Sequence, residues 1–255
     1  MPTLYEWSRR LAEPVLPLLH ATVRHDLARL LARLGDEESN GRTRRRPALL
    51  DVGGRRSPYT VALPCDVTVL DLPRDGEVQA SLDLGLTERL LAQLRARRSN
   101  IVDVRLEDMT RTALPSQSFD AAVSVEVIEH VPDDAAFVAQ IARILKPGGF
   151  AYLTTPNGDY RRNVPPHENP DHLRHYTRDA LAALLREHFA LVEVRYGIQM
   201  GRNWYTGLRS MSATRPVQTL RTMTANLRNR RESRDKAEVA HRTAHLFAIA
   251  QKPHA

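Results

Sequence analysis

The sequence has one cysteine, Cys65, among 255 residues, so no disulfide can form within the chain. No apolar run approaches the roughly 18 residues that cross a bilayer, and no basic segment followed by an apolar one opens the chain as a secretion signal would. We therefore expect a cytoplasmic protein without a transmembrane segment. Its 42% hydrophobic and 26% charged residues are typical of globular chains and exclude collagenous and disordered classes.

Lysine is scarce as well, with three lysines against 34 arginines, and the net charge of +7 is unevenly distributed. Residues 1–46 carry +3, residues 47–208 carry −3 and residues 209–242 carry +6. Binding through phosphates needs a continuous basic surface, whereas two flanking segments hold the positive charge here. The pattern favours a solvated or partner-facing surface, and we do not expect nucleic acid as a partner.

Apolar residues recur every three or four positions over residues 4–34, which is typical of amphipathic helix. Pro14 and Pro17 interrupt this pattern and predict two helices. Residues 37–47, which are rich in arginine, then predict an exposed linker. We therefore divide the chain into an N-terminal helical cap and linker, residues 1–46, and a main domain, residues 47–255.

Short β-branched runs alternate with helical patterns through the main domain, which predicts a doubly wound α/β sheet. The predicted strands cover residues 48–52, 67–71, 101–105, 119–125, 149–154, 190–196 and 245–250, and the predicted helices cover residues 87–98, 133–145 and 177–188. Residues 199–242 are too long for a plain loop and predict a basic, helical insertion before the last strand.

Two predicted strands end in groups that suit a ligand. The first ends in Asp51-Val-Gly-Gly54, and the second ends in Asp71. In open parallel sheets the ligand lies beyond the carboxyl ends of the strands, where Asp71 could accept hydrogen bonds from a ribose. A tight turn and a helix cap would explain the same residues. The chain lacks Gly-x-Gly-x-x-Gly after the first strand, which argues against NAD.

Three further motifs follow in order: Leu-Pro-Ser-Gln-Ser-Phe-Asp at 114–120, Glu-His-Val at 129–131 and Leu-Lys-Pro-Gly-Gly at 145–149. Together with Asp51-Val-Gly-Gly54 and Asp71 they resemble the class I S-adenosylmethionine-dependent methyltransferases, in the branch with quinone-biosynthesis, sugar and natural-product enzymes. The resemblance covers residues 47–196 and the closing strand. It implies a Rossmann-like, seven-stranded sheet, with the helical cap and the helical insertion as additions.

The resemblance also implies S-adenosyl-L-methionine as the cofactor and assigns its binding residues. The methionine part would contact the first glycine loop, the ribose would contact the end of the second strand, and adenine the end of the third. The implied set is Asp51, Gly53, Gly54, Tyr59, Asp71, Leu72, Glu107, Asp108, Met109, Val125 and Glu126. The sequence departs from the family at Arg55, where another glycine is usual.

The segment 165–177 is rich in histidine and resembles a His/Arg/aromatic-Thr signature that closes over the active site in this branch. A histidine suits proton removal from an acceptor hydroxyl, and we take His130 and His167 as the candidate catalytic residues, with His172 and His175 behind them. Helix capping and loop anchoring would explain these residues without catalysis. We expect no metal ion, although the histidines and acids of this segment lie close together.

We therefore predict O-methylation of a small-molecule acceptor such as a sugar, a natural product or another secondary metabolite. The alternatives are an RNA methyltransferase, which the basic flanks would suit, and a non-catalytic cofactor-binding protein, which the incomplete glycine loop would suit. Residues 1–34 and 199–242 hold apolar side chains without an obvious partner. We expect them to cover the acceptor side of the site or to form a homodimer interface.

Overall fold

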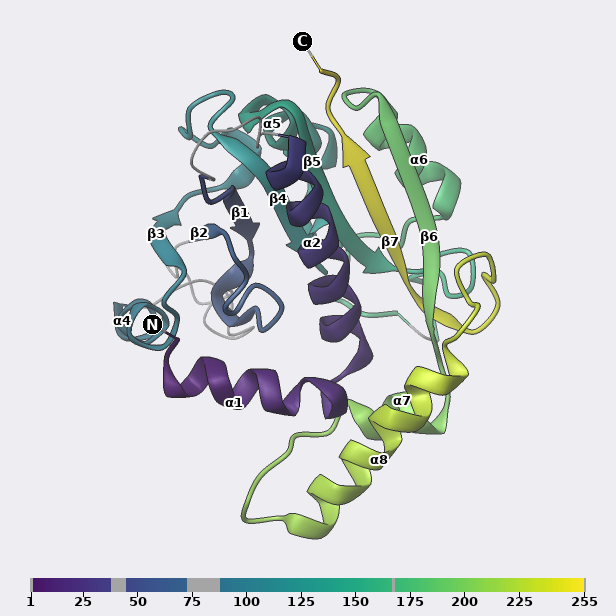
Figure 1. Cartoon of the computed structure of the whole chain (residues 1–255). Coiled ribbons are helices and arrows are strands. Elements are labelled where there is room, and N and C mark those ends of the chain that lie inside the picture. The colour runs from purple at the N-terminus through teal and green to yellow at the C-terminus, as the bar shows by residue number, and fades with distance from the viewer. Residues whose placement is uncertain (1, 38–44, 73–87, 167, 255) are drawn as a thin grey trace.

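The computed structural model describes residues 2–37, 45–72, 88–166 and 168–254. A seven-stranded sheet with the order β3-β2-β1-β4-β5-β7-β6 forms its centre (Figure 1). The strands are β1 (Ala48–Val52), β2 (Asp66–Asp71), β3 (Ile101–Leu106), β4 (Phe119–Val125), β5 (Leu145–Pro156), β6 (Leu191–Gln199) and β7 (Thr243–Gln251). β7 runs antiparallel to both of its neighbours, β5 and β6. The predicted seven-stranded, Rossmann-like fold is confirmed.

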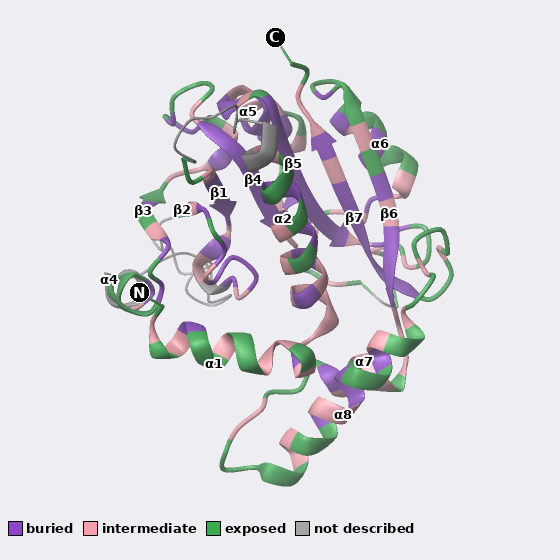
Figure 2. Cartoon of the chain, viewed as in Figure 1, coloured by how far each residue is buried: buried purple, intermediate pink, exposed green. Residues whose placement is uncertain are grey.

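Helices cover both faces of the sheet, and an apolar cluster lies under each layer (Figure 2). On one face, α5 (Asp134–Ile144) and α6 (Arg178–Arg186) pack against β4, β5 and β7. On the other face, α2 (Leu18–Glu37) and α4 (Glu88–Arg97) pack against β1, β2 and β5. Strands buried on both sides explain why their sequences are apolar without alternation.

The N-terminal segment forms two helices that meet at a proline, as predicted. α1 (Leu4–Ala12) begins with a capping box between Thr3 and Glu6, and it passes into the short 3₁₀-helix η1 (Glu13–Val15), which contains Pro14. α2 is integrated with the sheet, because its Asp26 accepts hydrogen bonds from the Tyr152 hydroxyl at 2.7 Å and the Arg195 guanidinium at 2.5 Å. That residues 1–46 form a unit separate from the main domain, residues 47–255, stays a prediction.

The insertion between β6 and β7 is helical, as the sequence predicted. It contains α7 (Arg202–Gly207) and α8 (Pro216–Glu232), which lie below the sheet beside α1 (Figure 1). The Asn226 amide donates to the carbonyl of Val15 at 2.8 Å, and the Arg230 guanidinium donates to the carbonyls of Glu13 and Pro14. The insertion and the N-terminal helices are therefore packed together.

One boundary differs clearly from the prediction. β5 begins at Leu145, so the Lys-Pro-Gly-Gly motif lies inside the strand rather than in a turn before residue 149. Gly148 has φ +75°, which a side chain rarely tolerates, and the pairing with β4 shifts register between Phe119 and Ala121. The strand thus passes through an irregular stretch instead of starting after it.

Candidate functional site

A pocket of about 480 Å³ lies beyond the carboxyl ends of β1, β2 and β4. This is the edge where parallel α/β sheets bind their ligands, and the volume lies in the range of small-molecule sites. The lining residues are Val52, Gly53, Arg55, Leu70, Asp71, Leu72, Glu107, Asp108, Met109, Thr110, Val125, Glu126, Val127, His130, Val131, Pro132, Asp133 and Phe137. Nine of the predicted cofactor and catalytic residues are among them.

Asp71 ends β2 and presents a largely buried carboxylate to the pocket. It accepts a hydrogen bond from the amide of Leu72 at 2.9 Å, and the Arg55 guanidinium lies 3.5 Å from both of its oxygens. Burial raises the pKa of Asp71, and the charge of Arg55 opposes this shift. The residue that departs from the family's glycine loop thus contacts the carboxylate predicted to bind ribose.

Asp51 lies behind the pocket wall rather than in it. Its fully buried carboxylate accepts hydrogen bonds from the hydroxyls of Ser57, Tyr59 and Thr60. Burial raises the pKa of Asp51, while the nearby Arg98 guanidinium lowers it. Asp51 therefore holds the loop after β1 in shape, and its geometry offers no direct contact with a ligand in the pocket.

The close packing around Asp51 and Val127 explains why glycines occupy positions 53 and 54. Gly53 lines the pocket at φ +71°, where an added Cβ would lie 2.7 Å from Val127. Gly54 begins the 3₁₀-helix η2 (Gly54–Arg56), and its Cβ would collide with the Asp51 carboxylate. Gly54 and Tyr59, two further predicted cofactor residues, do not line the pocket. Tyr59 is buried among apolar side chains, with its hydroxyl directed at Asp51.

The predicted adenine end of the site follows β3. Asp108 caps the 3₁₀-helix η3 (Met109–Arg111) by accepting from the amide and the hydroxyl of Thr110 at 2.9 and 2.8 Å. Glu107 accepts from the Thr112 hydroxyl at 2.6 Å and from the amide of Ala113. Both carboxylates therefore shape this turn, and both still line the pocket beside Met109.

Glu126 follows β4 with φ +54°, an unusual backbone conformation for a residue with a side chain. Its carboxylate accepts from the Thr154 hydroxyl at 2.8 Å and lies 3.1 Å from Nδ1 of His245. Burial acts to raise the pKa of Glu126, but the charge and hydrogen bond of His245 outweigh it, so the pKa is lowered. A carboxylate held ionised here suits a neighbouring cation.

Three histidines lie in a row that begins at the pocket-lining His130: its ring meets that of His172 edge-on at 4.8 Å, and His172 in turn is hydrogen-bonded to His175. Nδ1 of His130 lies 2.6 Å from the carbonyl of Asp171, so it carries the hydrogen and Nε2 keeps a lone pair. By the same reasoning, Nδ1 of His175 donates to the carbonyl of Arg161 at 2.7 Å, and Nε2 of His175 accepts from Nδ1 of His172 at 2.8 Å. Nε2 of His172 is then also free to accept. The other catalytic candidate, His167, lies outside the described residues.

Burial and the neighbouring rings of His130 and His175 lower the pKa of His172 to about 4, so this ring is neutral at physiological pH. Glu129, on the 3₁₀-helix η4 (Ile128–His130), is fully buried, and burial and the Glu126 carboxylate raise its pKa well above the usual value. In the described part of the chain, Glu129, His130 and His172 bring one ligand atom each within 4.8 Å of one another, a spacing that could hold a metal ion. The segment 167–175 alone does not predict this cluster.

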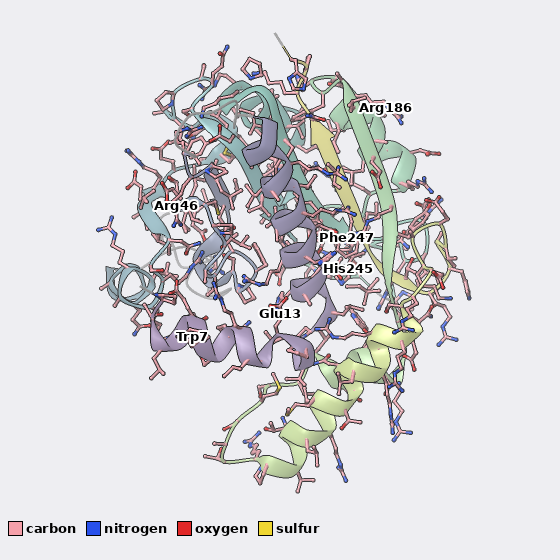
Figure 3. The ribbon with its side chains drawn as sticks, in the orientation of Figure 1. Trp7, Glu13, Arg46, Arg186, His245 and Phe247 are labelled. Atoms are coloured by element: carbon pink, nitrogen blue, oxygen red, sulfur yellow. The ribbon has the colours of Figure 1, made fainter. Side chains whose placement is uncertain are left out.

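Two functional candidates escaped sequence reasoning because they come from distant parts of the chain. His245 lies near the start of β7 (Figure 3). Its ring meets that of Trp204 in α7 edge-on, with the ring centroids 6.3 Å apart. His20 lies near the start of α2, and the charges of His245 and Glu126 act on it. Neither residue belongs to a recognisable motif. The N-terminal helices and the insertion thus each bring a side chain to the Glu126 end of the site.

His20 predicts a pH dependence of stability. Burial, with the charges of Arg9 and His245, lowers its pKa from 6.5 to about 4. Since the unfolded chain binds the proton more readily, the stability that neutral His20 provides is complete above pH 6.5 and is lost as the pH falls towards 4. When the pH is lowered from 7 to 4, the free energy of unfolding, measured with urea, should fall by about 3 kcal/mol more in the wild type than in His20→Gln. Exposed His188→Gln should behave as the wild type, and equal losses in all three proteins would contradict the prediction.

Comparison with known proteins identifies the family. The model of the methyltransferase domain family matches residues 19–193. Over 123 residues the chain is 35% identical to a probable S-adenosylmethionine-dependent methyltransferase of Mycolicibacterium smegmatis, covering 47% of each protein. Over 89 residues it is 34% identical to a ubiquinone biosynthesis O-methyltransferase of Paracidovorax citrulli, covering 34% of this chain and 37% of that protein. The matches therefore span less than half of these relatives.

Solved structures agree on the fold. Burkholderia thailandensis 1,6-didemethyltoxoflavin-N1-methyltransferase, with bound 1,6-didemethyltoxoflavin and S-adenosylhomocysteine, has a TM-score of 0.54 at 18% identity and covers 93% of this chain and 79% of that one. The [4+2]-cyclase SpnF has a TM-score of 0.54 at 17% identity, and the match covers 100% of this chain and 98% of that one. The chain belongs to the methyltransferase domain family and has the class I fold of S-adenosylmethionine-dependent methyltransferases.

The pocket fits this cofactor. Asp71, Glu107, Asp108 and Glu126 line it with carboxylates, while Leu72, Met109 and Phe137 supply apolar surface for a flat ring. Carboxylates suit a ligand with a sulfonium and an ammonium group better than a phosphate-binding loop would. No helix in the described part of the chain is long and apolar enough to cross a membrane.

Proposed function

We propose that this methyltransferase transfers the methyl group to a hydroxyl oxygen of a small-molecule acceptor. The observation that carries the proposal is the lone pair on Nε2 of His130, a pocket-lining ring whose Nδ1 is fixed by the Asp171 carbonyl. A neutral imidazole oriented in this way can take the proton that a hydroxyl loses as it is methylated. The named function of the ubiquinone O-methyltransferase relative supports the same reaction class.

S-adenosylmethionine, when bound, supplies an electrophilic methyl group on a cationic sulfur. Different residues of the chain would bind the cofactor and position the acceptor. Asp71 and Asp108 would hold the adenosine part, and Gly53 would allow close approach of the loop after β1. Glu126, ionised and at the end of β4, would lie on the sulfonium side, and His130 would face the acceptor.

The acceptor side favours a small molecule over RNA. His245 contacts the pocket residue Glu126 and stacks against Trp204 of α7, and the α7–α8 insertion packs against the N-terminal segment. Nucleic acid would need an open, basic approach to the pocket, whereas the only cationic side chain among the pocket-lining residues is Arg55, next to Asp71. The similarity to a cyclase and to an N-methyltransferase shows that the fold alone does not determine the acceptor.

The first test is cofactor binding. The wild type should bind S-adenosylhomocysteine, and Asp71→Ala should weaken binding about ten- to a hundredfold, because a hydrogen bond donated to a charged group contributes roughly 1.5–3 kcal/mol. Isothermal calorimetry measures this directly. Asp66→Ala is the matched control, since Asp66 begins the same strand far from the pocket and pairs with Arg46. Equal affinity in Asp71→Ala and the control would remove Asp71 from the cofactor site.

The second test is turnover. With labelled S-adenosylmethionine, a panel of phenols, sugars and hydroxylated metabolites should include methyl acceptors, whereas bulk tRNA should not be labelled. Mass spectrometry of the product locates the methyl group on oxygen or nitrogen. Labelled tRNA would support the RNA alternative, and cofactor binding without any turnover would support a non-catalytic protein.

A further inference from the structure

The helix α1 exposes its apolar side to solvent. Leu4 and Leu11 are 87% and 79% exposed, and Trp7 between them is 53% exposed. These positions share one side of the helix, because they are spaced by three and four residues. The only buried residue of α1 is an acid, Glu6. A helix packed on a protein core normally has the opposite arrangement.

The helix α8 repeats this arrangement in the insertion. Its buried residues are small or polar, namely Thr222, Ala225, Asn226 and Asn229. Its exposed side instead carries Val217 and Leu220, which are 64% and 65% exposed, and Leu227. In the described part of the chain, the two helices and the residues between α7 and α8 thus hold a large share of the exposed aliphatic and aromatic side chains. A surface of this kind usually contacts a partner.

Polar bonds hold both helices in this orientation. The Glu6 carboxylate accepts from the amide and the hydroxyl of Ser99 at 2.8 and 2.9 Å. The Asn226 amide donates to the carbonyl of Val15 at 2.8 Å, and the Asn229 amide donates to the carbonyl of Gln199 at 2.7 Å. Rolling either helix to hide its leucines would leave these buried polar groups without partners, which is costly.

The charge of the surface selects the kind of partner. On α8, Arg221, Arg228 and Arg231 are exposed along with the leucines, and residues 209–242 carry a net charge of +6. Two copies of the chain would bring this positive charge together, and nucleic acid would leave the leucines and Trp7 without apolar contacts. An anionic lipid surface satisfies both groups, because the side chains reach the acyl boundary while guanidinium groups pair with lipid phosphates.

We propose that the exposed sides of α1 and α8, which we call the basal surface, bind the surface of anionic membranes. Both helices lie at the same end of the molecule, below the carboxyl edge of the sheet (Figure 1). Membrane-surface helices combine leucine and tryptophan on one side with arginine beside them, as α1 and α8 do. The proposal does not depend on the identity of the methyl acceptor.

Vesicle binding tests the proposal. The full-length protein should sediment with vesicles of equal parts phosphatidylcholine and phosphatidylglycerol, and weakly or not at all with phosphatidylcholine alone. Raising the salt concentration should weaken binding. In Trp204→Phe, Trp7 is the only tryptophan, and its fluorescence should shift to shorter wavelength when the anionic vesicles are added.

Two double variants separate the contributions. L220S/L227S and R221E/R228E should each lower the partition constant for the anionic vesicles about tenfold or more. The matched controls are Leu191→Ser, which changes an exposed leucine at the start of β6, and Arg186→Glu, which changes an exposed arginine away from the basal surface (Figure 3). Unchanged circular-dichroism melting curves should show that all four variants are folded.

Four results would overturn the proposal. They are no binding of the wild type to anionic vesicles, equal losses in the controls, a solution dimer that L220S/L227S converts to monomer, and salt-dependent retention of tRNA by a protein that does not bind vesicles. The last two would assign the basal surface to self-association and to nucleic acid. Failure of the vesicle assay would leave cofactor binding and methyl transfer unaffected, so it can be told apart from failure of the proposed function.

Discussion

His130→Asn is expected to slow methyl transfer about 10²- to 10⁴-fold, the usual contribution of a positioned proton acceptor. The asparagine amide can still donate to the carbonyl of Asp171, as Nδ1 of His130 does at 2.6 Å. The substitution therefore removes the Nε2 lone pair while keeping the local hydrogen bond. Affinity for S-adenosylhomocysteine should stay within a few-fold, so the loss should fall on kcat rather than on cofactor binding.

Steady-state kinetics with an identified acceptor measures this effect, with His188→Asn as the control on an exposed histidine. An unchanged kcat in His130→Asn would exclude His130 as the proton acceptor. Chelation offers a second check, because Glu129 and His172 lie near His130 with the spacing of metal ligands. If a chelator abolishes wild-type activity and a divalent cation restores it, His130 acts as a metal ligand instead.

Asp51→Ala is expected to lower the free energy of unfolding by about 3–5 kcal/mol, the range for removing one partner of a buried ionic network. The variant leaves the hydroxyls of Ser57, Tyr59 and Thr60 without their shared acceptor. It also leaves the buried Arg98 guanidinium without a nearby carboxylate, although Arg98 still donates to Thr60 at 2.6 Å. Much of a small domain's stability would be lost.

Urea unfolding monitored by circular dichroism checks this expectation. Asp103→Ala is the control, because Asp103 is half-exposed on the edge strand β3 and pairs with Arg105 at the surface. Its unfolding free energy should change by no more than about 0.5 kcal/mol. A loss of less than about 1 kcal/mol in Asp51→Ala would show that the Asp51 network does not stabilise the loop.

Sequence patterns predicted the sheet well because its strands are short, apolar and separated by helices. Residues 48–52 and 119–125 match β1 and β4 at both ends. The β5 boundary was missed because Lys-Pro-Gly-Gly has the composition of a turn, while pairing with β4 overrides that local preference. The antiparallel direction of β7 depends on how the chain returns from the insertion, and local composition carries no signal for it.

The sequence predicted the site residues that directly follow strand ends. It did not predict those whose position depends on tertiary contacts. Asp71 and Asp108 come directly after runs that form β2 and β3, so the topology carries them to one edge. Asp51 has the same position on β1, but the hydroxyls of the following loop turn its carboxylate inwards. His245 pairs with Glu126 from 119 residues away, a contact that no local motif indicates.

The pairing of β6 with β7 has a consequence for how acceptor preference could change. Because the two strands are antiparallel neighbours, with Gln199 paired to Thr243, the chain leaves and re-enters the sheet at adjacent points. Spanning such fixed ends costs only about 0.6 kcal/mol more for each doubling of loop length. Residues 200–242 are therefore joined to the sheet at one place, and a cassette of another length or sequence in their position would have to replace the contacts of Asn226 and Arg230 with residues 13–15.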